Sequence, residues 1–150
     1  MTGYENLTTD EDGYLTGLRF SDSGETAWED EPVLDETERQ LGEYFRGERM
    51  RFELPIRLNG TPFQKEVWQT LCGIPYGETV SYGDIAVRIG RPKACRAVGM
   101  ANHRNPVSII VPCHRVIGAD GRLTGYGGGL SVKEALLMHE QNWKDQHVEV

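Results

Sequence analysis

Two short helical patterns joined by a tight turn place the strongest limit on the fold of this chain. Ser81 and Asp84 form a capping box that opens the first pattern, and Gly90 ends it. Pro92 then opens a second pattern, which should continue to about Ala101. Short helices connected in this way predict a helix-turn-helix.

Further helix signals follow residue 60. Thr61 opens another capping box, and its helix should end near Gly73. A final helix should begin at Ser131. Between them, the apolar run at residues 107–111, ended by Pro112, predicts a buried strand.

The first sixty residues have a different pattern. Residues 14–20 predict a short strand, and a capped amphipathic helix should begin at Asp35 and end at Gly47. Residues 52–58 predict a second strand, which Pro55 confines to a sheet edge.

Together these elements predict an α+β fold in two parts, with the turn Asn59-Gly60 as the boundary. Residues 1–60 should form a small acidic N-terminal α/β subdomain. Residues 61–150 should form a mostly helical C-terminal domain that contains the helix-turn-helix.

Charge is distributed unevenly along the chain, whose formal net charge is -7. Residues 1–60 hold 15 acidic and 6 basic side chains, whereas residues 61–150 hold 8 and 10. In residues 81–116 only Asp84 is acidic, against six basic side chains: Arg88, Arg91, Lys93, Arg96, Arg104 and Arg115. Such a local basic face can attract phosphate on an acidic protein, although an arginine-rich solvated surface fits the charges equally well.

No run approaches the roughly 18 apolar residues that a membrane span needs, and no export signal is visible at the N-terminus. We therefore expect a cytoplasmic protein that does not bind membranes. Its three cysteines cannot all pair, so free thiols are expected. Cys72 and Cys95 fit the pattern of small buried hydrophobes within helices.

Cys113 lies in a different setting, directly after Pro112 and before His114. The proline stops sheet pairing, which should leave the cysteine at a rigid, partly accessible strand end. The neighbouring imidazole and the guanidinium of Arg115 favour the nucleophilic thiolate. From the residues alone, a reactive cysteine and a small buried hydrophobe are equally good interpretations.

Glu140, at the end of the last helix, is a candidate to orient His114, with a solvated carboxylate as the alternative. The cysteines and histidines show neither CxxC nor HxxxH spacing, so no metal site is expected.

Several separated motifs resemble the O6-alkylguanine-DNA alkyltransferase family over residues 61 to 141. They lie at residues 76–86, 92–102, 105–106, 111–116 and 125–130. The resemblance implies direct-reversal repair of double-stranded DNA, in which the alkyl group of O6-alkylguanine moves irreversibly to Cys113. O4-alkylthymine is a further candidate substrate. A single-turnover methylated-DNA–[protein]-cysteine S-methyltransferase, monomeric and without a cofactor, is implied.

The same resemblance implies a role for individual residues. A Glu140–His114–water–Cys113 relay would activate the thiol, with Asn105 in the same network. The DNA-binding residues would include Arg96 as a finger inserted into the duplex and Tyr82 at the phosphate or the base edge of the target, together with Lys93, Ala97 and Arg104. The substrate pocket would be formed by Val116, Tyr126, Gly127 and Pro112.

Residues 1–60 would then be a remnant of a ribonuclease H-like or ferredoxin-like domain that lacks its first strand before Thr8. Residues 61–150 would form the DNA-binding and catalytic domain. Other functions remain open at this point: a non-catalytic binder of alkylated DNA, a helix-turn-helix transcription regulator, and a cysteine hydrolase. Family members that bind without repair carry tryptophan at the acceptor position, where this chain has Cys113.

Overall fold

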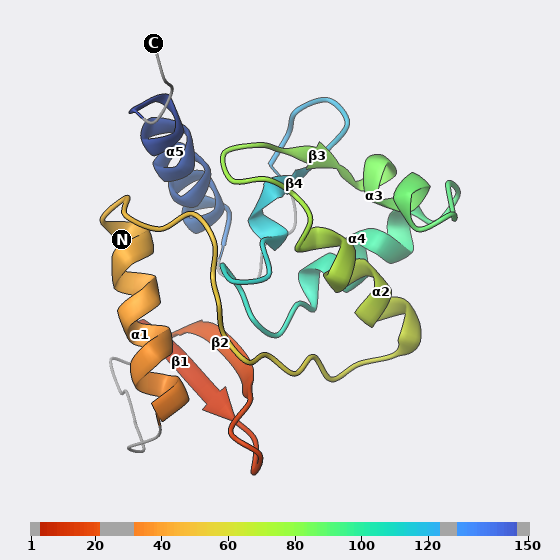
Figure 1. Ribbon diagram of the computed structural model, residues 1–150. Helices are drawn as coiled ribbons and strands as arrows, with labels where there is room; N and C mark the ends of the chain where they lie inside the picture. Colours follow the sequence, from red (N-terminus) through yellow and green to blue (C-terminus); the bar gives the residue numbers. More distant parts are fainter. Residues whose placement is uncertain (1–3, 22–31, 124–128, 147–150) are drawn as a thin grey trace.

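A β-hairpin and one helix from the N-terminal residues lie beside a cluster of short helices from the rest of the chain (Figure 1). The computed structural model describes residues 4–21, 32–123 and 129–146. Its elements are β1 (Tyr4–Thr9), β2 (Leu15–Ser21), α1 (Pro32–Phe45), α2 (Pro62–Leu71), β3 (Val80–Ser81), α3 (Tyr82–Arg88), α4 (Cys95–His103), the 3-10 turn η1 (Cys113–Arg115), β4 (Val116–Ile117) and α5 (Leu130–Gln146).

The N-terminal part begins with an antiparallel hairpin of β1 and β2, in which Leu7 pairs with Leu18. The predicted strand at residues 14–20 is confirmed, but the expected loss of a strand before Thr8 is wrong, because β1 occupies that position. Helix α1 begins at Pro32, three residues before the predicted Asp35, since proline is well suited to the first turn.

Residues 52–58 form an extended segment rather than the predicted strand. Their pairing with β2 is a single bridge between Leu15 and Ile56, in which Leu15 N–H donates to Pro55 O at 2.8 Å. The ladder does not continue because Pro55 has no N–H to donate.

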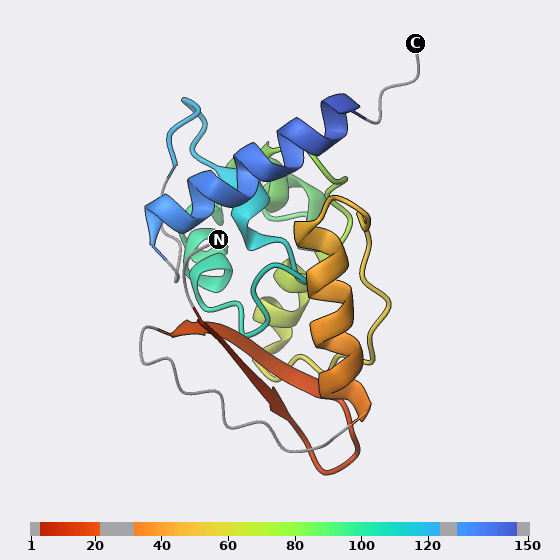
Figure 2. The same cartoon turned by 90° about the vertical axis from the view of Figure 1, so that its left-hand side faces the viewer.

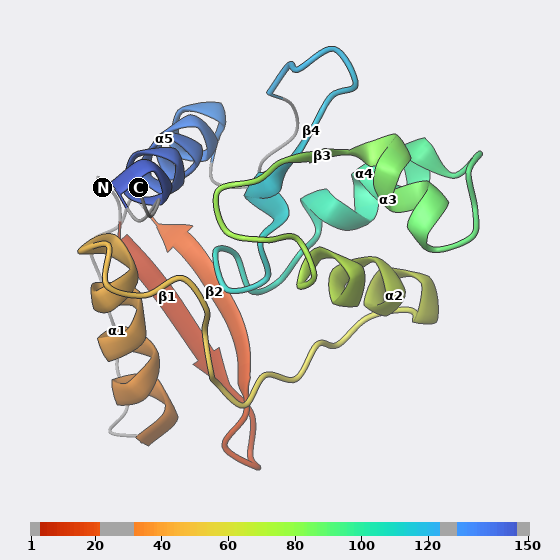
Figure 3. The same ribbon diagram turned by 45° about the horizontal axis from the view of Figure 1, so that its top comes forward.

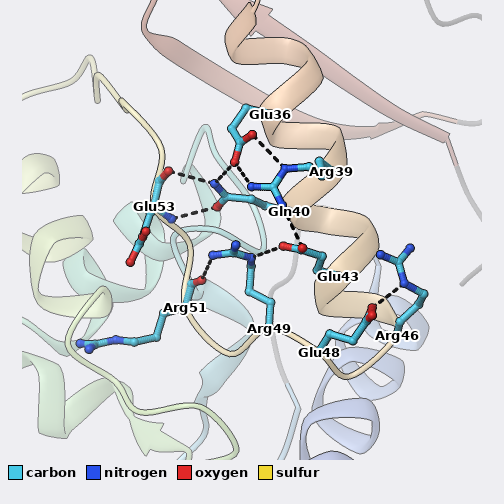
Figure 4. Close-up of polar contacts among 9 residues, drawn as sticks. All are labelled: Glu36, Arg39, Gln40, Glu43, Arg46, Glu48, Arg49, Arg51 and Glu53. Atoms are coloured by element: carbon cyan, nitrogen blue, oxygen red, sulfur yellow. Dashed lines mark hydrogen bonds and ion pairs between the residues drawn. The ribbon is translucent and has the colours of Figure 1, made fainter.

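A network of charged and amide side chains joins α1 to this segment (Figure 4). The buried Gln40 amide donates to Glu53 O at 3.0 Å, and its carbonyl accepts from Glu53 N at 2.9 Å. Glu43 accepts from Arg39 at 2.9 Å and from Arg49 at 2.8 Å. The network fixes α1 on the side facing residues 48–53.

Both predicted capping boxes of the C-terminal part are present, at Thr61 and at Ser81. Helix α4 differs from the prediction, because it begins at Cys95 instead of Pro92. The preceding residues form a turn in which Ala94 N–H donates to Arg91 O at 2.9 Å. Proline is favoured at the second position of such a turn, so Pro92 belongs to the turn and not to the helix.

The apolar run at residues 107–111 is buried as predicted, but it is not a strand. Ile109 has a φ of 71°, and the chain turns back so that Val111 N–H bonds to Val107 O at 3.0 Å. One bridge, between Leu18 and Val107, ties the run to β2. An apolar run without periodicity specifies burial and leaves the backbone path open.

The core lies between the hairpin, α1 and the C-terminal helices, with α5 crossing one side (Figure 2). Helices α2, α3 and α4 lie together on the side away from α1 (Figure 3). The Trp68 indole on α2 donates to Ala101 O on α4 at 2.8 Å, and β3 pairs in parallel with β4. Within residues 4–21, 32–123 and 129–146, no helix has the length and apolar character needed to cross a membrane.

Candidate active site

Cys113 is the first residue of η1, and it is buried, with 4% of its surface exposed. The prediction of a partly accessible strand end is therefore wrong, because the preceding run folds back over itself. Burial raises the pKa of the Cys113 thiol, and hydrogen bonding from Asn105 and the charge of Lys133 act in the opposite direction. The two other cysteines, Cys72 and Cys95, are exposed, contrary to the expectation that they are core residues.

The loop before Cys113 is held by Asn105, which is itself buried. Its amide donates to Val111 O at 2.8 Å, and its carbonyl accepts from Val107 N at 3.0 Å. Both ends of the loop are thereby joined to one side chain. A left-handed, β-branched Ile109 within the loop is strained, so these bonds are needed to maintain its path.

Glu140 of α5 is fully buried and lies beside His114, as the prediction of an orienting carboxylate requires. The Nε2 atom of His114 is 2.7 Å from Glu140 Oε2. Arg115 donates to the same carboxylate through Nε at 2.8 Å and Nη2 at 2.9 Å, and Tyr44 Oη donates to Oε2 at 2.7 Å. The bonds from His114 and Arg115 keep the pKa of Glu140 far below its usual range despite burial.

His114 is held with one ring nitrogen toward Glu140 and the other without a hydrogen-bond partner in the described part of the chain. Burial lowers the pKa of His114, and Glu140 partly offsets that shift. A neutral ring with its proton on Nε2 donates to Glu140 and leaves Nδ1 as an acceptor. The site therefore contains a nucleophile and, on the next residue, an imidazole able to accept a proton.

Sequence reasoning missed three polar residues that bond to η1, to the residue after it or to Glu140. Asn102 of α4 donates to Cys113 O at 3.3 Å, which joins the second helix of the helix-turn-helix to the site. Lys133 of α5 is buried and donates to Val116 O at 2.5 Å, and Tyr44 comes from α1. Their positions in the sequence give no signal, because polar residues on amphipathic helices are ordinarily solvated.

A groove of about 560 Å³ lies along α4, with Tyr82 of α3 also lining it. Of the predicted DNA-binding residues, Tyr82, Arg96 and Arg104 line it, together with Cys95, Gly99, Met100 and His103. Ala97 and Lys93 are exposed but are not among the lining residues, and Lys93 lies in the turn before α4 rather than on the helix.

Two of the four residues predicted to form the substrate pocket lie within the described residues. Pro112 and Val116 are buried on either side of η1, whereas Tyr126 and Gly127 lie outside the described residues. A cavity of about 520 Å³ adjoins Pro112 on the side of Tyr76 and Arg115. No group of three or more metal-binding side chains occurs in the portion of the chain that the structure describes.

Comparison with known proteins identifies this arrangement. The DNA binding domain of 6-O-methylguanine DNA methyltransferase matches residues 62–142, and its ribonuclease-like domain matches residues 3–58. The methylated-DNA–protein-cysteine methyltransferase of Methanosarcina acetivorans is 51% identical over 139 residues, which cover 89% of each chain. The chain belongs to the 6-O-methylguanine DNA methyltransferase family.

Other relatives agree with this membership. The methyltransferase of Methanosarcina barkeri is 57% identical over 114 residues, which cover 76% of this chain and 72% of the relative. The crystal structure of Mycobacterium tuberculosis OGT in complex with DNA has a TM-score of 0.82 and 46% identity, with 93% of each chain covered. The predicted family resemblance and α+β fold class are therefore confirmed.

Proposed function

We propose that this member of the 6-O-methylguanine DNA methyltransferase family is a methylated-DNA–[protein]-cysteine S-methyltransferase, which takes alkyl groups from O6 of guanine in double-stranded DNA onto Cys113. One observation carries the proposal: Cys113 adjoins His114, which is 2.7 Å from buried Glu140 and has Nδ1 without a described partner. That geometry suits proton removal from the thiol.

The transfer is a single displacement. The proton of Cys113 passes through a water to Nδ1 of His114, and Glu140 stabilises the imidazolium that results. The sulfur attacks the alkyl carbon, so a C–S bond forms as the C–O6 bond breaks. The electron pair goes to the purine, which takes up a proton and is restored to guanine. A thioether has no low-energy route back, so each molecule acts once and needs no cofactor.

An alkyl group on O6 is shielded inside the base stack, so the damaged nucleotide must first leave the duplex. Arg96 occupies the space left behind, and Tyr82 contacts the phosphate of the target. Lys93, Ala97 and Arg104 bind the flanking backbone. The exposed positions of Arg96 and Arg104 along the groove support these roles. Phosphate contacts of this kind should make binding strongly dependent on salt.

Once extruded, the base is held by the substrate pocket. The carbonyls of Cys113 and Val116 accept from the guanine amino group, and Pro112 forms part of the wall. Tyr126 and the backbone of Gly127 donate toward O6, where charge develops as the bond breaks.

The division of work follows from these roles. Residues 1–60 form the N-terminal subdomain, a ribonuclease H-like or ferredoxin-like remnant, and residues 61–150 bind DNA and carry out the transfer. The protein acts as a monomer in the cytoplasm, where DNA is available and thiols stay reduced. O4-alkylthymine is a second candidate substrate.

The test is incubation with a duplex that carries O6-methylguanine labelled in the methyl group. We expect label on a peptide that spans Cys113, with at most one group per molecule, and none after Cys113→Ser. Cys95→Ser is the matched control, because that thiol is exposed and lines the protein groove along α4. Transfer that survives Cys113→Ser contradicts the proposal, and damage-specific binding without any transfer indicates a non-catalytic binder.

A further inference from the structure

A single carboxylate oxygen of Glu140 accepts hydrogen bonds from three side chains. Tyr44 Oη lies 2.7 Å, His114 Nε2 2.7 Å and Arg115 Nη2 2.9 Å from Oε2. The other oxygen, Oε1, accepts from Arg115 Nε at 2.8 Å and from Gly77 N at 3.3 Å. Tyr44 belongs to α1, so a side chain from the N-terminal part contacts the carboxylate that orients the histidine.

Orientation of the carboxylate does not require Tyr44. The two parallel bonds from Arg115 fix the plane of Glu140, as planar guanidinium–carboxylate pairs do. What Tyr44 changes is the charge that Oε2 presents to His114. A second donor on the same oxygen withdraws part of that charge, which weakens the stabilisation of a protonated imidazole.

The hydroxyl of Tyr44 cannot readily swing away. The residue is fully buried, and its ring packs against Phe52 at 5.5 Å, Tyr76 at 6.1 Å and His139 at 5.0 Å between centroids. His139 of α5 also lies 2.8 Å from Tyr44 O. One turn earlier on the same face of α1, the Gln40 pairing with Glu53 holds the helix in place (Figure 4).

We propose that Tyr44 is a positioning residue for alkyl transfer: by sharing Glu140 Oε2 with His114, it keeps the imidazole neutral, with Nδ1 ready to accept the proton of Cys113. The inference rests on the proposed function. It also gives the N-terminal part a contribution to the chemistry, beyond its packing against the C-terminal helices.

Tyr44→Phe leaves the other titratable side chains around this pair unsubstituted. They are Tyr76 from the loop after α2, Cys113 and Arg115 of η1, and Lys133 and His139 of α5. Any change in the protonation of His114 in a Tyr44→Phe variant is therefore assigned to the lost hydroxyl.

Tyr76→Phe is the matched control. The Tyr76 hydroxyl is buried beside the same carboxylate but has no hydrogen-bond partner among the residues described. Both variants keep an aromatic ring in place. The rate of alkyl transfer from free O6-benzylguanine is measured from pH 5 to 9, with thermal unfolding as a check on folding.

In Tyr44→Phe we expect the rising limb of the pH–rate profile to move upward by about one pH unit. At pH values well below the midpoint of that limb the rate then falls roughly tenfold, while the rate on the high-pH plateau stays within about twofold. Tyr76→Phe should follow the wild type. Identical profiles for the two variants, or a uniform loss at every pH, overturn the proposal.

A second measurement is independent of transfer activity. The ¹⁵N resonances of His114 report its proton affinity in the folded protein, and we expect the same upward shift in Tyr44→Phe only. An unchanged His114 titration overturns the role of Tyr44. Failure of the wild type to take up any alkyl group instead contradicts the proposed function, while the titration still tests the sharing of Oε2.

Discussion

Arg115 donates to both oxygens of Glu140, from Nε at 2.8 Å and from Nη2 at 2.9 Å, and the two side chains are 7% and 0% exposed. A third donation from Arg115, to Ile74 O at 2.7 Å, anchors the pair to the loop after α2. Both charges are almost completely withdrawn from solvent, so each depends on the other. Breaking such a pair leaves an uncompensated buried charge.

Glu140→Gln should therefore destabilise the fold strongly. We expect the free energy of unfolding in urea to fall by about 3–5 kcal/mol, because the Arg115 guanidinium loses its counter-charge. Glu134→Gln, at an exposed position on the same helix, is the control and should change stability by less than about 0.5 kcal/mol. Equal losses in the two variants would contradict this account of the buried pair.

The pH dependence of stability follows from the same carboxylate. The pKa of Glu140 is held far below its unfolded value of 4.5, so its contribution is fully present above that value. It is lost as the pH falls through the folded pKa. Wild-type stability should thus decrease as the pH drops below about 4.5, and that part of the slope should be absent in Glu140→Gln.

Some of this site could be predicted from sequence because local signals specify it. The capping boxes at Thr61 and Ser81 are short-range hydrogen-bond patterns, and both formed as expected. Residue chemistry makes Cys113, His114 and Glu140 candidates and leaves alternatives open, while the family resemblance implies their roles; the structure brings His114 Nε2 within 2.7 Å of Glu140 Oε2.

The remainder depends on contacts between distant segments. Tyr44 and Glu140 are 96 residues apart, and no periodicity links them. The apolar character of residues 107–111 predicts burial, but it is the same in a buried strand and in a buried turn. The prediction of a strand is therefore wrong, whereas the prediction of burial holds. The exposed Cys72 and Cys95 show that a place within a helical pattern does not fix which face a cysteine occupies.

Asn105→Ala should loosen the loop that leads to Cys113. The substitution removes the bonds to Val111 O and from Val107 N, both in a buried setting, so we expect a loss of about 2–3 kcal/mol in stability to urea. Transfer from free O6-benzylguanine should slow as well. Asn142→Ala, exposed on α5, serves as the control; a comparable loss there would show that the effect is not specific to the loop.

Lys133→Met should change how the thiol responds to pH. Burial lowers the pKa of Lys133 to about 8, so the ammonium is present at neutral pH and favours the thiolate of Cys113. We expect iodoacetamide to alkylate Cys113 more slowly at pH 7 in the methionine variant than in the wild type, because the ammonium that favours the thiolate at that pH is gone. Lys65→Met, at an exposed position on α2, should not change that rate.

Lys133 also predicts a stability change with a defined sign. Between pH 8 and about 10 the unfolded chain binds a proton at this lysine that the folded chain does not, so wild-type stability should rise with pH. The rise should be smaller in Lys133→Met. A slope that is the same in both proteins would show that the lysine is solvated in the folded state.

Arg96→Ala separates extrusion of the nucleotide from the transfer itself. Extrusion costs a few kcal/mol, and each 1.4 kcal/mol lost is about tenfold in rate, so repair of a duplex should slow roughly 10–100-fold. Free O6-benzylguanine needs no extrusion, and its reaction should stay within about twofold of the wild type.

Arg88→Ala is the matched control, because that arginine is exposed at the end of α3 and is not among the residues that line the groove. It removes the same charge, so a duplex-specific loss in Arg96→Ala alone assigns the effect to position within the groove. Equal slowing with both substrates would instead place Arg96 among the residues that support the folded site.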